Sequence, residues 1–355
     1  MDLESKIDLV KEVGEELITE EELRSLFETK NNPVAYDGFE PSGKIHIAQG
    51  ILRAINVNKM VKAGCKFKLL VADWHAWANN KLDGNLDNIQ KAGDYMVEVW
   101  KSTGMQLDNV EFVNASELVS KKEYWDKVMQ VAINSTLKRT LRCCQIMGRN
   151  ESDALQSSQI IYPCMQAADI FHLEVDIAQL GMDQRKVNML AREIAPKLNY
   201  KKPIAVHHHM LMGLTPISTG ATGVAKAIEM KMSKSKPNSA IFMTDSEKEV
   251  QKKMNKAFCP EKIVEDNPVL EYCKFIVFEK FKEFEVERPE KFGGDVSFGS
   301  YMELEDAFAK GDLHPMDLKV GTAKYVNELL EPVRTHFEKN AKAKKLLEEV
   351  NSFSN

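Results

Sequence analysis

Short apolar segments alternate with longer amphipathic ones between residues 34 and 209, and this alternation restricts the fold more than any other feature of the chain. The spacing of Ile47, Ile51 and Ile55, for example, places three apolar side chains on one face of a helix. Strands are predicted at 34–39, 66–74, 110–116, 175–181 and 204–209. Strands that alternate with helices form a parallel sheet covered by helices on both faces. The sequence therefore predicts an α/β fold for this region.

The remainder of the chain predicts a second unit. From about residue 241 the pattern becomes mostly helical, and a length of 355 residues fits about two domains of roughly 150 residues each. The formal net charge of −5 and the pI of about 6.0 give no overall sign of nucleic-acid binding. Binding to a nucleic acid would therefore have to rest on local basic patches.

Cysteine usage and hydropathy point to the cytosol. The six cysteines form no CxxC pair and no regular spacing, which is typical of reduced thiols and not of a disulfide framework or a zinc site. The N-terminal segment is acidic and amphipathic, unlike a signal peptide, and no apolar run approaches the roughly 18 residues that span a bilayer. We expect a cytoplasmic protein without a membrane segment.

The segment "GKIHIAQG" (43–50) is the first candidate for a binding site, because ligands bind beyond the carboxyl ends of parallel strands. It places His46 and Gln49 at the start of a helix, flanked by Gly43 and Gly50. The free N–H groups and positive dipole end of a helix start suit a phosphate. Taken alone, the segment fits a capped helix with a solvated histidine better than a phosphate site. A GxGxxG dinucleotide fingerprint is absent.

A second candidate is the lysine-rich segment "KMSKS" at 231–235. Its composition alone fits a solvated surface loop, but the order of its residues is far more specific. The ammonium groups of Lys231 and Lys234 can neutralise the charge that develops on a departing pyrophosphate, which contributes most in the transition state.

A polar stripe along the segment 160–173 predicts a cavity wall. Tyr162, Gln166 and Asp169 follow each other at helical spacing, among apolar neighbours, and Pro163 is placed near the start of the helix. Such side chains cannot pack in an apolar core without polar partners, so we expect them to line a cavity. Gln184, after the next strand, can add another amide.

Two histidine-containing segments stay ambiguous or unpromising. His75 in "DWHAW" fits either the border of a binding site or a packed histidine–tryptophan corner. The run "HHHM" at 207–210 resembles a metal cluster, but consecutive strand residues point to opposite faces. No carboxylate or cysteine lies close by in sequence, so we predict no metal site.

Taken together, these segments resemble the class I aminoacyl-tRNA synthetases, whose two signatures match "HIAQG" and "KMSKS". The common form of the first signature is His-Ile-Gly-His, from which this chain departs. The longer segments resemble the tyrosyl-tRNA synthetases of the archaeal and eukaryotic type over about residues 30–335. They include "YDGFEPSGKIHIAQG" (36–50), "LLVADWHAWANNKL" (69–82), "IIYPCMQAADIFHLEVDIAQLGMDQRKVNMLAREI" (160–194) and "DLHPMDLK" (312–319).

The resemblance implies a Rossmann-type parallel-sheet catalytic domain followed by an α-helical anticodon-binding domain. The implied organisation is an N-terminal helical extension at 1–30, a catalytic domain at 31–225 with a connecting insertion at about 118–160, a KMSKS linker at 226–240 and the helical domain at 241–355.

The resemblance also implies an activity. The carboxylate of L-tyrosine attacks the α-phosphate of ATP, which is accompanied by Mg²⁺, and releases pyrophosphate. The tyrosyl adenylate then transfers tyrosine to the terminal adenosine of tRNA-Tyr. No side-chain nucleophile is needed, so catalysis consists of positioning and charge stabilisation by His46, Lys231 and Lys234. The residues implied in ATP binding are Gly43, His46, Gln49, Gly50, Lys231, Met232, Ser233, Lys234 and Ser235.

By the same resemblance, Tyr36 and Asp169 hold the substrate phenol, and its amino end is held by Tyr162, Gln166 and Gln184. A phenol both donates and accepts a hydrogen bond, so phenylalanine would leave these groups unpaired. For tRNA, Arg185 and Lys186 are expected at the acceptor stem, and His314 and Asp317 at the anticodon guanine. Relatives of this type are homodimers, and the same is expected of this chain.

Three alternatives remain open from the sequence. A tryptophanyl-tRNA synthetase shares the fold and both signatures, but its substrate indole is donor-only and makes the Tyr36 hydroxyl superfluous. A small-molecule adenylyltransferase would act without tRNA and would not need the helical domain. A non-catalytic RNA-binding derivative would not need an intact KMSKS segment.

Overall fold

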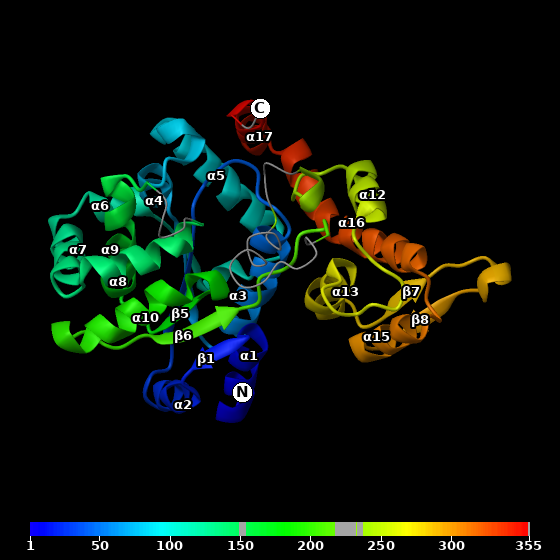
Figure 1. The fold of residues 1–355 in the computed structure, drawn as a ribbon, viewed down its shortest axis with the longest axis horizontal. Coiled ribbons are helices and arrows are strands. Elements are labelled where there is room, and N and C mark those ends of the chain that lie inside the picture. Colours follow the sequence, from blue (N-terminus) through cyan, green and yellow to red (C-terminus); the bar gives the residue numbers. More distant parts are fainter. Residues whose placement is uncertain (149–153, 217–231, 233–236, 354–355) are drawn as a thin grey trace.

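The computed structural model of the chain describes residues 1–148, 154–216, 232 and 237–353. Its largest feature is a six-stranded sheet in the order β1-β6-β5-β2-β3-β4 (Figure 1). All neighbouring strands are parallel except β1, which pairs antiparallel with β6. The strands are β1 (Glu16–Ile18), β2 (Val34–Phe39), β3 (Lys66–Val71), β4 (Val110–Asn114), β5 (Ile177–Gly181) and β6 (Ile204–His208). The predicted α/β fold is confirmed.

The strand order reverses between β2 and β5. From β2 the chain adds β3 and β4 on one side, and it then returns to place β5 and β6 on the other. The carboxyl ends of β2 and β5 therefore form the switch point at which such sheets bind ligands.

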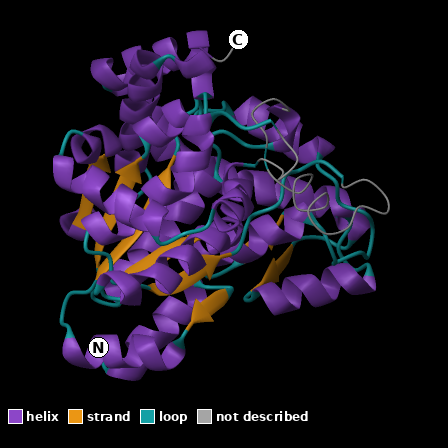
Figure 2. Cartoon of the chain, turned by 60° about the vertical axis from the view of Figure 1, so that its left-hand side comes forward, coloured by secondary structure: helices purple, strands orange, loops and turns teal. Residues whose placement is uncertain are grey.

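The strands alternate their side chains between two apolar cores. Leu69 belongs to one core and Leu70 to the other, as the period of two in a strand requires. Figure 2 shows helices on both sides of the sheet. The first core is continuous with the C-terminal helical unit, whereas the second is closed by the helices of the insertion. The helices up to residue 194 are α1 (Leu3–Val13), α2 (Glu20–Thr29), α3 (Arg53–Lys62), α4 (Asp73–Ala78), α5 (Leu86–Ser102), α6 (Ala115–Val119), α7 (Lys122–Ile133), α8 (Leu137–Cys143), α9 (Ser157–His172) and α10 (Arg185–Ile194).

Helix α9 begins earlier than the sequence suggested, so the expectation that Pro163 stands near a helix start is wrong. Pro163 lies inside the helix, where it cannot donate a hydrogen bond to the carbonyl of Gln159. That carbonyl instead accepts from the thiol of Cys144 at 3.5 Å. The helix begins at Ser157, where Gln156 and Gln159 form a capping box.

The C-terminal unit is mostly helical, as predicted, but it also contains the hairpin of β7 (Phe284–Val286) and β8 (Val296–Phe298). Its long helix α16 ends next to α17, which packs on α5 of the catalytic unit (Figure 1). The helices are α12 (Glu247–Lys256), α13 (Pro268–Tyr272), α14 (Phe278–Lys280), α15 (Tyr301–Lys310), α16 (Pro315–Lys339) and α17 (Ala341–Phe353).

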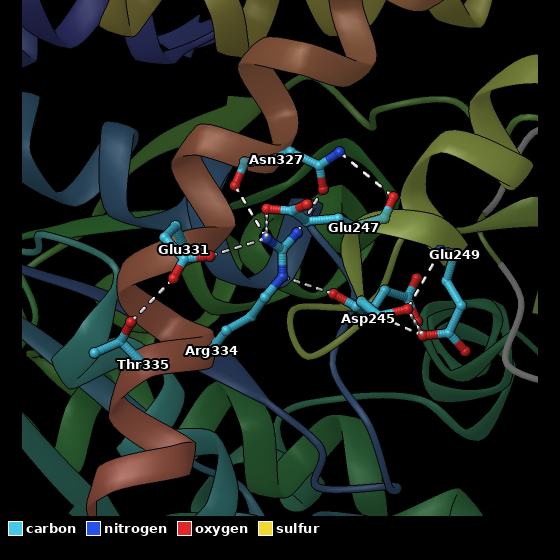
Figure 3. Close-up of polar contacts among 8 residues, drawn as sticks. Asp245, Glu247, Glu249, Asn327, Glu331, Arg334 and Thr335 are labelled. Carbon is cyan, nitrogen blue, oxygen red and sulfur yellow. Dashed lines mark hydrogen bonds and ion pairs between the residues drawn. The ribbon is translucent and has the colours of Figure 1, made fainter.

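A polar junction fastens α16 to the segment that precedes α12 (Figure 3). The Arg334 Nε donates to the carbonyl of Asp245 at 2.9 Å, and the same guanidinium contacts Asn327 and Glu331. The carboxylate of Asp245 accepts from Lys253 at 2.6 Å and from the backbone N–H of Phe242 at 2.9 Å. The start of the helical unit is thereby fastened to the long helix α16.

No helix within the described part of the chain has the length and apolar character needed to cross a membrane.

Candidate active site

A cavity of about 380 Å³ opens at the switch point of the sheet. Its wall includes the carboxyl-terminal half of β2, the last residue of β5 and the end of β6. The residues predicted from the sequence that line it are Tyr36, His46, Gln49, Tyr162, Gln166, Asp169, Gln184 and Met232. Segments that are up to about 200 positions apart in the sequence thus meet around one space, as a single ligand site requires.

One end of the cavity presents a buried carboxylate. Asp169 is 0% exposed, and its Oδ1 accepts a hydrogen bond of 2.8 Å from the hydroxyl of Tyr124. Its Oδ2 lies 2.9 Å from Nε2 of His75, but no hydrogen bond to Oδ2 is aligned among the described residues. Burial, and then the Asp169 charge, raise the pKa of the neighbouring Tyr36 well above its ordinary value, so its hydroxyl keeps its proton. A phenol fits this end as donor to Oδ2.

A second acceptor lies one helical turn away on α9. The Gln166 Nε2 donates to Oε1 of Gln184 at 3.2 Å, and Gln184 in turn donates to the carbonyl of Ile146 at 3.1 Å. These bonds fix the amide of Gln166 so that its Oε1 is buried and has no hydrogen-bond partner in the described part of the chain. Buried acceptors are almost always paired in native proteins, so this one indicates a ligand that donates, such as an ammonium group.

The predicted phosphate-binding segment lies against the residues that follow the KMSKS segment. The backbone of Ile47 donates to the carbonyl of Ile241 at 2.8 Å, and Met243 donates to the carbonyl of Ile45 at 3.0 Å. An antiparallel bridge joins His46 to Phe242 between them. The first signature is thus joined to residues 241–243, and His46, Gln49 and Met232 form part of the cavity wall.

The local backbone and packing explain why this segment has glycine at positions 43 and 50. Gly43 has a φ of 103°, in the left-handed region that favours glycine. A side chain at Gly50 would meet the sulfur of Met243 at 2.2 Å, so close packing requires glycine there. Neither is among the described residues that line the cavity, and their approach to ATP stays a prediction. Lys231, Ser233, Lys234 and Ser235 lie outside the described residues.

The residues predicted to contact tRNA lie apart from the wall of the cavity. Arg185 begins α10 directly after Gln184, and its guanidinium is paired with Glu16 at 2.8 Å. The next residue, Lys186, bonds the side chain of Gln145. His314 caps α16 by accepting from the N–H of Met316 at 3.1 Å, and Asp317 lies in the first turn of that helix.

The three consecutive histidines at the end of β6 face different partners. His207 contacts Glu16 at 2.8 Å, and Nδ1 of His208 lies 2.8 Å from the amide of Gln179. His209 lies 3.2 Å from Glu271. Within the described part of the chain, no group of three or more histidine, cysteine or acidic side chains gathers as a metal site.

Sequence reasoning missed two features of the site. Tyr124, which contacts Asp169 from α7, carries no local signal, because its role depends on a contact between residues 45 positions apart. The buried Arg53 pairs with Asp37 beside the cavity and donates to Gln179 at 2.7 Å. The one sequence signal for the Arg53–Asp37 pair was the position of Arg53, a charged residue among the apolar residues of a predicted helix.

The doubly wound sheet, with a polar, amino-acid-sized cavity at its switch point and a histidine at a helix start, fits the class I synthetase resemblance found in the sequence. The family described as "tRNA synthetases class I (W and Y)" matches residues 28–331 of the chain. "Tyrosine--tRNA ligase 1, cytoplasmic" of Arabidopsis thaliana is 50% identical over 355 residues, which cover 99% of this chain and 89% of that relative. The tyrosine--tRNA ligase of Thermococcus kodakarensis is 45% identical, with 99% of both chains covered.

Among solved structures, the tyrosyl-tRNA synthetase of Pyrococcus horikoshii complexed with L-tyrosine superposes with a TM-score of 0.92. It is 42% identical and covers 98% of this chain and 100% of its own. The chain therefore belongs to the tyrosine--tRNA ligases within the class I tRNA synthetases. The resemblance found in the sequence is confirmed, and the relatives' names do not support the tryptophan alternative.

Proposed function

We propose that this chain activates L-tyrosine with ATP, forming tyrosyl adenylate and pyrophosphate, and then transfers tyrosine to the 3′-terminal adenosine of tRNA-Tyr. The proposal includes Mg²⁺ bound with ATP and a cytoplasmic location, which the names of two Arabidopsis relatives support.

One observation carries the choice of amino acid. Asp169 Oδ2 and Gln166 Oε1 are two buried acceptors without an aligned hydrogen bond from any described residue, and both face the same cavity. L-Tyrosine has a donor at each end, the phenol and the ammonium group. Phenylalanine lacks the first donor and would leave Asp169 desolvated and unpaired, which is costly. Synthetases of this specificity are themselves the standard example of such discrimination, on the order of 10⁵-fold.

The proposed chemistry needs no side-chain nucleophile, because the substrate carboxylate itself attacks the α-phosphate. The protein would hold the two reactants in line and stabilise the negative charge on the departing pyrophosphate. His46 is proposed for this role because it lies in the cavity wall at the start of a helical segment. Lys231 and Lys234, with Ser233 and Ser235, are proposed from the KMSKS sequence to contact the phosphates. Gly43, Gln49, Gly50 and Met232 complete the proposed ATP site.

For tRNA, we propose that Arg185 and Lys186 contact the acceptor stem and that His314 and Asp317 read the anticodon. Arg185 is 46% exposed, and an RNA phosphate would compete with Glu16 for it. The start of α16 lies in the helical unit, away from the cavity, as a separate anticodon contact requires. The proposed division of the chain is the one expected from the sequence: an N-terminal extension at 1–30, a catalytic domain at 31–225 with an insertion at about 118–160, a linker at 226–240 and a helical domain at 241–355.

A homodimer is part of the proposal, and an apolar stripe on the insertion supports it. Trp125, Met129 and Ile133 follow one another at helical spacing along α7, Leu137 is the first residue of α8, and all four are exposed to solvent. Several large apolar side chains exposed on one segment are typical of an interface.

Pyrophosphate exchange dependent on an added amino acid tests the proposal. Tyrosine, tryptophan and phenylalanine are supplied side by side with Mg·ATP, and aminoacylation of tRNA-Tyr is measured in parallel. We expect exchange and aminoacylation with tyrosine. Exchange with tryptophan alone, or none with tyrosine, contradicts the proposal, whereas tyrosine exchange without transfer to tRNA favours the adenylyltransferase alternative.

A further inference from the structure

The carboxylate of Asp169 is held by two side chains that come from other parts of the fold. Tyr124 on α7 donates to Oδ1 at 2.8 Å, and His75 on α4 places Nε2 at 2.9 Å from Oδ2. Tyr124 is 0% exposed and His75 is 1% exposed, so water competes with neither contact. These three residues come from segments that are about 45 positions or more apart in the sequence.

The surroundings make both partners necessary. Asp169 lies among the apolar residues of the second core, where a carboxylate without donors is strongly unfavourable. Burial, and then the Asp169 charge, raise the pKa of Tyr124 well above its ordinary value, so its hydroxyl is always a donor. For His75, burial opposes the charged ring, but Asp169 outweighs this effect and raises the pKa of the imidazole above its ordinary value.

These contacts also fix the direction in which the carboxylate points. The terminal torsion of an aspartate is broad when nothing restrains it. The bond from Tyr124 occupies Oδ1 from behind, since Tyr124 lies outside the described residues that line the cavity. The aromatic ring of Tyr124 is itself held edge-on by Trp125 and His172 at centroid distances of 5.7 and 5.5 Å. Oδ2 lies close to His75 but accepts no aligned hydrogen bond from a described residue, so it is the oxygen that can still accept one from a ligand.

We propose that Tyr124, with His75, is a positioning residue that aims Asp169 at the substrate phenol and so sets the preference for tyrosine over phenylalanine. This inference rests on the proposed function, in which L-tyrosine is the substrate. Tyr124 acts through Asp169 and does not touch the substrate.

Tyr124→Phe removes the donor and keeps the ring, and Tyr95→Phe is the matched control. Tyr95 is also 0% exposed, its hydroxyl lies 3.5 Å from Thr244, and it is not among the described residues of the cavity wall. We measure pyrophosphate exchange with tyrosine and with phenylalanine, and follow folding by thermal unfolding. A hydrogen bond to a charged group corresponds to about 10- to 150-fold in binding. We therefore expect Tyr124→Phe to raise KM for tyrosine by about tenfold or more, with kcat changed by less than about threefold.

The preference for tyrosine over phenylalanine should fall by the same factor, because phenylalanine makes no bond to Asp169. A loss of packing alone would instead weaken both amino acids equally. In an Asp169→Asn background the effect of Tyr124→Phe should be much smaller, since the two changes act on one contact.

An unchanged tyrosine preference in folded Tyr124→Phe, or effects that simply add in the double variant, overturns the inference. If Tyr124→Phe does not fold, His75→Gln removes the other contact of Asp169, the one at Oδ2. A folded His75→Gln enzyme with an unaltered preference for tyrosine over phenylalanine would also overturn the inference. Wild-type protein without tyrosine-dependent exchange would refute the proposed function instead, so the two failures are distinguishable.

Discussion

Replacing Asp169 with asparagine removes one charge from the wall of the cavity and keeps the shape of the side chain. The phenol then loses a bond to a buried carboxylate, and such a bond contributes about 1.5–3 kcal/mol. At about 1.4 kcal/mol per factor of ten, kcat/KM for tyrosine should fall by about 10- to 150-fold. Phenylalanine loses no bond, and the variant no longer leaves a buried charge unpaired beside its ring. The reaction with phenylalanine should therefore stay equal or improve.

The assay is pyrophosphate exchange with each amino acid, with Asp126→Asn as the control. Asp126 lies on the exposed surface of α7, where it pairs with Lys122 at 2.7 Å, and its loss should leave both reactions unchanged. The unfolding temperature of each variant separates a loss of recognition from a loss of fold. An equal decrease for tyrosine and phenylalanine in a folded Asp169→Asn enzyme would refute the assignment of Asp169 to the phenol.

Three further predictions follow from other parts of the structure. Gln166→Leu should raise KM for tyrosine and for phenylalanine alike, by about tenfold, because both share the ammonium group; a change in their ratio would contradict this. Burial works against the charged form of Asp176, but Lys201 and Lys30 outweigh it and lower the pKa of Asp176. Its stabilising effect is present above its unfolded pKa and lost as pH falls through the folded pKa, so Asp176→Asn should lower the melting temperature at pH 7 by about 2–5 °C and flatten its acid dependence. An Asp176→Asn variant that melts at the same temperature as the wild type at pH 7 would contradict this stabilising role of Asp176. Ile133→Glu should convert a dimer to a monomer in sedimentation velocity, and a variant that stays dimeric would place the interface elsewhere.

Local patterns predicted the part of the site that lies on single elements. The spacing of Tyr162, Gln166 and Asp169 indicated one face of a helix, and these residues do line the cavity. The parallel sheet followed from the alternation of strands and helices, and its switch point is where such folds bind ligands. These inferences succeeded because they depend on periodicity within each segment and on the order of segments along the chain.

Features that depend on contacts between distant segments were not predictable. Nothing near Tyr124 in sequence shows that its hydroxyl meets a carboxylate on another helix. The interior position of Pro163 depends on the Cys144 thiol, which occupies the carbonyl that proline leaves without a donor. Strand β3 ends at Val71, short of the expected residue 74, because Asp73 begins α4 and accepts from the N–H of Ser116. Each of these outcomes is decided by tertiary partners.

The orientation of bound L-tyrosine is the most direct test of the account, and a crystal structure of the complex measures it. The phenol oxygen should lie within hydrogen-bonding distance of Asp169 Oδ2, and the ammonium nitrogen within that distance of Gln166 Oε1. A tyrosine bound in the reverse direction, or one whose phenol reaches neither Asp169 nor Tyr36, would contradict it.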